Sequence, residues 1–130
     1  MIDRSRDRGA VNVLSCGEFS IAELRALLDR AALYVGGDSG PLHVAATTSV
    51  PIVGLYGPTL PDRSAPWRDA RLTSESVDAG PLPCRPCDQR VCAPGDFRCL
   101  TWVTPQQVVD AAERVIMRLR DSATAPTLSR

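Results

Sequence analysis

The 130-residue sequence has no lysine and one histidine, so all the positive charge of its basic residues comes from arginine. Basic and acidic residues balance at 15 each without a basic run, so composition gives no support to nucleic-acid binding. No apolar run approaches the roughly 20 residues of a membrane span. Residues 1–10 alternate Arg and Asp without an apolar stretch, so we expect no secretory signal. We therefore expect a cytoplasmic protein whose five cysteines are mostly reduced or metal-bound.

The sequence predicts one α/β domain, because short apolar runs alternate with amphipathic segments. The apolar runs are almost uninterrupted, which is typical of strands buried on both faces in a parallel sheet. We therefore expect a Rossmann-like parallel sheet with flanking helices. The predicted parts are a flexible lead-in at 1–10, the domain at 11–120 with a Cys-rich loop at 79–100, and a flexible tail at 121–130.

Capping boxes mark the starts of two predicted helices. One begins after Ser20, with Glu23 reaching back, and the other begins after Thr104, with Pro105 at its first position. A shorter helix is expected after Gly40. The predicted strands lie at 11–14, 33–35, 52–56 and, more weakly, 71–74.

Two loops rich in Gly, Pro, Ser and Thr follow the strands at 33–35 and 52–56. A helix joins these strands, so they are parallel and their carboxyl ends share one edge of the sheet. Ligands of open α/β sheets bind at that edge, and the helix start after Gly40 favours an anion there. We expect a phosphate-bearing ligand, such as a nucleotide diphosphate. The expected contacts are backbone approach at Gly37 and Gly40 and hydroxyl donation from Ser39 and Thr59.

Asp38 and His43 each allow two interpretations. A carboxylate repels a diphosphate, so Asp38 either accepts hydrogen bonds from sugar hydroxyls or caps the following helix. His43 either faces the ligand or is structural. The Gly57–Thr59 sequence is by itself also compatible with a simple turn.

Four cysteines lie close together at positions 84, 87, 92 and 99. Cys84 and Cys87 have zinc-knuckle spacing, whereas Cys92 and Cys99 are spaced irregularly. The cluster therefore holds a structural metal, remains reduced, or forms disulfides that order the loop. Cys16 is expected to be a core residue, and no cofactor is expected.

The central motifs together resemble the C-terminal region of family 9 glycosyltransferases, the bacterial heptosyltransferases of lipopolysaccharide core synthesis. The matching residues are Asp38-Ser39-Gly40-Pro41-Leu42-His43, Ala45-Ala46, the strand from Pro51 to Gly57-Pro58-Thr59, and Pro66-Trp67. The resemblance implies a partial C-terminal domain of a GT-B enzyme that binds a nucleotide-diphosphate sugar, usually ADP-heptose. It places Asp38, Ser39, Gly40 and His43 at the donor diphosphate and sugar, and Phe19 near the adenine.

The family also has parts without a counterpart in these residues: an N-terminal acceptor domain and its catalytic Asp. Sugar transfer needs such a base, so we expect a donor-binding half that is inactive alone and has no catalytic residue of its own. Its expected partners are an acceptor domain or a second copy, because a half domain exposes a sheet edge and an apolar face. A peripheral position at the inner membrane face fits this function. The alternatives are a non-catalytic nucleotide-binding module and a small Cys-stapled structural domain.

Overall fold

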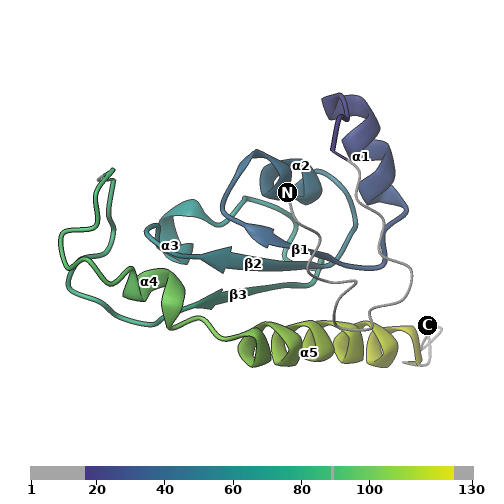
Figure 1. Ribbon diagram of the computed structural model, residues 1–130. Coiled ribbons are helices and arrows are strands. Elements are labelled where there is room, and N and C mark those ends of the chain that lie inside the picture. The colour runs from purple at the N-terminus through teal and green to yellow at the C-terminus, as the bar shows by residue number, and fades with distance from the viewer. Residues whose placement is uncertain (1–16, 89, 125–130) are drawn as a thin grey trace, which may run out of the picture.

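The computed structural model describes residues 17–88 and 90–124, which form helices on both faces of a small sheet (Figure 1). The strands are β1 (Tyr34–Gly37), β2 (Ile52–Tyr56) and β3 (Ser74–Asp78). The helices are α1 (Ile21–Asp29), α2 (Gly40–Ala46), α3 (Pro61–Ser64), α4 (Arg98–Thr101) and α5 (Pro105–Thr124). None of the described helices is long and apolar enough to cross a membrane.

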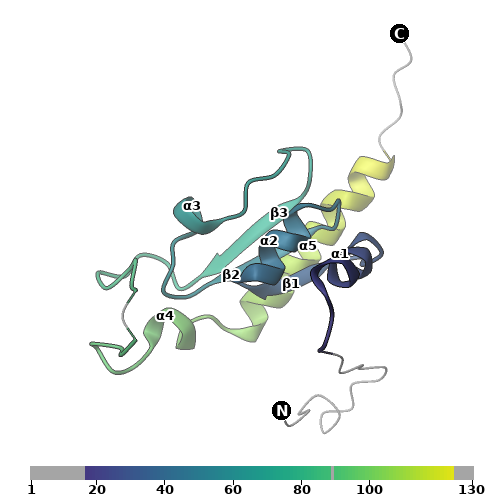
Figure 2. The ribbon, with the colours of Figure 1, turned by 90° about the horizontal axis from the view of Figure 1, so that it is seen from above.

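The three strands are parallel and lie in the order β1-β2-β3, so the predicted parallel α/β sheet is confirmed. Helices α1 and α2 cover one face, and α5 runs along the other (Figures 1 and 2). Because β1 and β2 are parallel, the loops that follow them leave the same edge of the sheet. That edge is also where α5 begins.

Each face of the sheet has its own small core. The core under α1 and α2 is built from Leu28, Leu42, Ala45, Val50, Ile52 and Tyr56. The core under α5 is built from Val53, Val77, Ala111 and Val115. Alternate residues of β2 therefore serve opposite faces, which explains why that strand is apolar almost throughout.

Glycines inside the strands make room for tyrosine rings. The Tyr34 hydroxyl occupies the space that a side chain on Gly36 would need. A Cβ on Gly54 would stand 2.9 Å from Cε2 of Tyr56. Gly36 and Gly54 face each other in the parallel register, so the two rings lie on neighbouring strands over the same face.

The predicted helix starts are confirmed, because both capping boxes form. The Ser20 amide donates to Glu23 Oε2 at 2.8 Å, and the Thr104 amide donates to Gln107 Oε1 at 2.7 Å. The third strand was predicted too early, at 71–74, because Leu72 closes a turn onto the Asp69 carbonyl before β3 begins.

Helix α5 continues to Thr124, beyond position 121 where the sequence predicted a tail. Arg114 and Arg118 both pair with Glu75 of β3, which holds the helix against the sheet. The predicted lead-in at 1–10, the strand at 11–14, Cys16 and the end of the tail lie outside the described residues. Part of the apolar surface is exposed, on β1 at Val35 and on α5 at Val109, Ile116, Met117 and Leu119.

Candidate functional site

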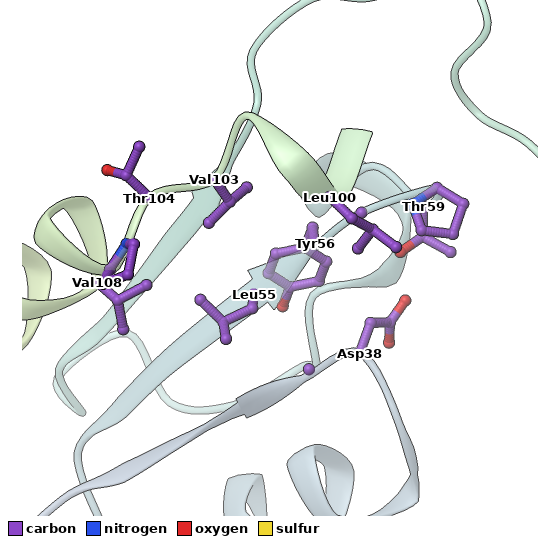
Figure 3. Close-up of a pocket in the computed structure, with 12 residues that line it drawn as sticks. Asp38, Leu55, Tyr56, Thr59, Leu100, Val103, Thr104 and Val108 are labelled. Atoms are coloured by element: carbon purple, nitrogen blue, oxygen red, sulfur yellow. The ribbon is translucent and has the colours of Figure 1, made fainter. Parts of the chain in front are cut away.

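A cleft of about 540 Å³ opens where the carboxyl ends of β1 and β2 meet the start of α5 (Figure 3). The sheet side contributes Gly37, Asp38, Leu55, Tyr56, Gly57, Pro58 and Thr59. The other wall consists of Leu100, Val103, Thr104, Pro105 and Val108. The cleft thus lies at the sheet edge that the topology of the sequence predicted.

The cleft has a polar end and an apolar end. Asp38 and Thr59 lie at one end, while Leu55, Val103 and Val108 line the other (Figure 3). Helix α5 has 20 residues and begins at the cleft, directly after its capping residue Thr104. The shape therefore offers one region for polar groups and another for a flat apolar group.

Asp38 is held firmly at the polar end. Its amide donates to the Leu55 carbonyl at 3.0 Å, which extends the β1–β2 pairing by one residue. Its side chain is only 16% exposed, and Oδ1 lies 3.6 Å from Nε2 of the half-exposed His43. Burial raises the pKa of Tyr56, and the negative charge of Asp38 raises it further, so this phenol stays neutral around pH 7.

The helix-cap interpretation of Asp38 is wrong. Helix α2 has Ser39 as its N-cap, and that side chain makes no capping hydrogen bond. The Ser39 hydroxyl instead donates to the Gly37 carbonyl at 3.2 Å. The Asp38 carboxylate therefore lies beside His43 at the cleft rather than serving the helix start.

Folding alone does not explain the glycines at positions 37 and 40. A Cβ on Gly37 would come no closer than 4.0 Å to a protein atom, the Leu55 carbonyl oxygen, and one on Gly40 would meet nothing within 4 Å. Gly57 is different, because a side chain there would strike Leu100 across the cleft. Gly37 and Gly40 thus keep backbone open to the surroundings, as the ligand-approach prediction requires.

Thr59 has an unusual hydroxyl group. Its Oγ1 is buried and has no hydrogen-bond partner among the described residues. Its carbonyl, in contrast, accepts a hydrogen bond of 2.6 Å from Nη2 of Arg85, a side chain only 1% exposed. The same guanidinium donates to the Gly80 carbonyl at 2.8 Å and contacts Asp78 at 3.2 Å. The protein therefore fixes the backbone of Thr59 while leaving its hydroxyl without a partner.

The predicted site residues are only partly gathered in the cleft. Gly37, Asp38 and Thr59 line it, whereas Ser39, Gly40 and His43 stand next to it on the α2 side. Phe19 precedes α1, is 43% exposed and does not line the cleft. Sequence reasoning missed the wall from Leu100 to Val108, for which the capping box at Thr104 was the one local signal.

The four cysteines of the Cys-rich loop line a second cavity, of about 290 Å³. All four are free thiols of intermediate exposure. Within residues 17–88 and 90–124, no group of three or more His, Cys, Asp or Glu side chains is arranged to hold a metal ion. The described geometry therefore does not support the structural-metal interpretation of these cysteines.

Comparison with known proteins agrees with the resemblance in the central motifs. The family model described as glycosyltransferase family 9 (heptosyltransferase) matches residues 2–94. This chain belongs to glycosyltransferase family 9. The match includes all of β1, α2, β2 and the two loops at their ends.

Relatives of this family 9 chain include proteins named as heptosyltransferases. The chain is 28% identical to lipooligosaccharide heptosyltransferase 2 of Campylobacter jejuni, over 78% of the chain and 31% of the relative. It is 36% identical to lipopolysaccharide heptosyltransferase 3 of Escherichia coli, over 57% of the chain and 21% of the relative. Each alignment thus spans less than a third of the relative.

A crystal structure of a family 9 glycosyltransferase from Veillonella parvula has the same fold over the matched part. The TM-score is 0.58 at 27% sequence identity, covering 78% of this chain and 28% of that one. The predicted Rossmann-like fold of a partial glycosyltransferase domain is therefore confirmed.

Proposed function

We propose that this family 9 chain is the donor-binding part of a heptosyltransferase-like enzyme. Its ligand would be an ADP-sugar such as ADP-heptose, destined for the lipopolysaccharide core. The main support is the cleft at the carboxyl ends of β1 and β2, which Asp38 and Thr59 line. The names of the relatives, which are heptosyltransferases, support the same class of reaction.

The chemistry of the polar end suits a sugar diphosphate. The Asp38 carboxylate can only accept hydrogen bonds when ionised, so it suits the hydroxyl groups of the sugar. The His43 side chain can donate to phosphate oxygens, and the Thr59 hydroxyl can do so after its side chain turns out of its buried position. The open backbone at Gly37 and Gly40 allows the diphosphate to come close. A position of Phe19 beside the adenine remains a prediction from the resemblance.

We further propose that these 130 residues bind the donor without transferring the sugar. Transfer requires a base that removes the proton of the acceptor hydroxyl. Asp38 and Tyr56 are the ionisable side chains that line the described cleft. The first is assigned to the donor, and the second is a phenol that is protonated at neutral pH, with burial raising its pKa further. The chain would act in the cytoplasm beside a separate acceptor-binding part.

Calorimetric titration of the purified chain with ADP-heptose and with ADP tests the proposal. We expect binding of the sugar nucleotide and a loss of about 10- to 100-fold in affinity for Asp38→Asn, because a charged hydrogen-bond acceptor is removed. His43→Ala should lower the affinity for both ADP-heptose and ADP. Asp62→Asn is the control, because Asp62 lies in α3 and does not line the cleft.

The alternatives predict different results. Equal affinity for ADP and ADP-heptose would favour a non-catalytic nucleotide-binding module, and no binding of either would favour a purely structural domain. Transfer of heptose to lipopolysaccharide core by the purified chain would contradict the proposed need for a separate base.

A further inference from the structure

The thiols of Cys84, Cys87, Cys92 and Cys99 converge on one cavity although the donor-binding proposal gives them no role. Each cysteine is partly exposed, so a small molecule in solution can reach the group. Four partly exposed free thiols therefore share one small cavity. The residues around the cavity determine which reactions these thiols can undergo.

Arginines lie close to these thiols. Arg85 and Arg90 line the cavity itself. The pKa of Arg98 is raised chiefly by its hydrogen bond with Asp96, and Cys84 and Cys92 contribute because they lie close enough to interact with it.

The backbone around Cys84 and Cys87 is held at several points. The Cys87 amide donates to the Pro58 carbonyl at 2.9 Å, and the Arg85 amide donates to the Leu82 carbonyl at 3.0 Å. The buried Arg85 side chain fixes one of the two residues between them. Only two residues separate these cysteines, so joining them costs less chain entropy than joining either one to Cys99.

The thiol-lined cavity and the donor cleft share a wall. Pro58 and Leu100 line both of them. The Cys87 amide is hydrogen-bonded to the Pro58 carbonyl, and Cys99 directly precedes Leu100 in α4. A change in the covalent state of these thiols therefore acts on two residues of the cleft.

We propose that Cys84 and Cys87 form a thiol–disulfide exchange site whose co-reactant is a low-molecular-weight disulfide such as oxidised glutathione. One protein thiolate attacks the glutathione disulfide and releases one glutathione thiolate, leaving a mixed disulfide. The second protein thiolate attacks the protein sulfur of that bond and releases the second glutathione. The protein pair is oxidised, glutathione is reduced, and the two protein protons end on the two glutathione thiols. Oxidation weakens donor binding through the shared wall, and this coupling rests on the proposed function.

The experiment uses the full chain with Cys16→Ser, equilibrated in reduced and oxidised glutathione and then alkylated for peptide mass spectrometry. We expect a reversible loss of two hydrogens in the peptide that contains Cys84 and Cys87. Cys87→Ser should instead trap one glutathione on Cys84, whereas Cys92→Ser should leave the disulfide intact. Failure of the disulfide to form, its formation with Cys92 or Cys99, or one zinc ion bound per chain would overturn the assignment.

Donor affinity is the second measurement, made on the reduced and oxidised forms of the same preparation. We expect oxidation to weaken ADP-heptose binding about fivefold or more. Unchanged affinity in a fully oxidised sample would refute the coupling. If neither form binds the nucleotide, the proposed function fails together with the coupling, whereas the mass measurement still decides the exchange site.

Discussion

Replacing Thr59 with valine should stabilise the chain and at the same time weaken its ligand binding. The two side chains have nearly the same shape, so the substitution removes a hydroxyl and little else. Thr59 Oγ1 is buried and has no hydrogen-bond partner within the part of the chain that the structure describes. Such a group reduces the stability of the folded state, because water would satisfy its hydrogen bonds in the unfolded chain.

The expected gain follows from that cost. A buried hydroxyl without a partner costs about 1–3 kcal/mol, and the partial exposure of the Thr59 residue as a whole favours the low end. We therefore expect Thr59→Val to raise the free energy of unfolding by about 1 kcal/mol. For a domain of this size, that corresponds to a melting temperature about 4 °C higher.

Ligand binding should change in the opposite direction. If the hydroxyl donates to a phosphate oxygen, its loss removes a hydrogen bond to a charged group worth about 1.5–3 kcal/mol. The affinity for ADP-heptose should then fall about 10- to 100-fold. Thermal melting with and without the sugar nucleotide measures both effects on one sample.

Thr48→Val is the matched control. The Thr48 hydroxyl is buried but satisfied, because it donates to the Ala45 carbonyl at 2.7 Å and accepts from the Val50 amide at 3.2 Å. The same substitution there should destabilise the fold by about 1–3 kcal/mol. A Thr59→Val chain that loses stability, or that binds the sugar nucleotide as tightly as the parent, would refute the reasoning.

Three further substitutions test other parts of the structure. Arg85→Ala should lower the free energy of unfolding in urea by about 3 kcal/mol, because it removes a buried guanidinium with three acceptors; unchanged unfolding would refute this role. Gly54→Ala should lower the melting temperature, because the added Cβ meets the Tyr56 ring; a wild-type melting temperature would contradict the packing. The pKa of Glu23 is lowered chiefly by its hydrogen bond with the Ser20 side chain, so its stabilising effect is present above the unfolded pKa and lost as pH falls through the folded pKa. Glu23→Gln should therefore flatten the acid side of the stability curve, and an unaltered slope would exclude this contribution.

Elements with strong local signals could be predicted from the sequence alone. The capping boxes at Ser20 and Thr104 form as expected, because their partners lie only three residues away. The strand β2 was equally clear, since it is apolar on both faces. The third strand could not be placed, because Val77 is its one buried hydrophobic residue and pairing with β2 determines where it lies.

The candidate site divides in the same way. Its polar end follows from chain order, because a crossover helix makes β1 and β2 parallel and brings Asp38 and Thr59 to one edge. The apolar wall does not follow from chain order, because Leu100, Val103 and Val108 lie more than 40 positions further along the chain than Thr59. Sequence by itself determined which residues share the polar edge. Only tertiary packing decided which distant side chains close the cleft, because burial of α5 against β2 and β3 depends on the whole assembled sheet.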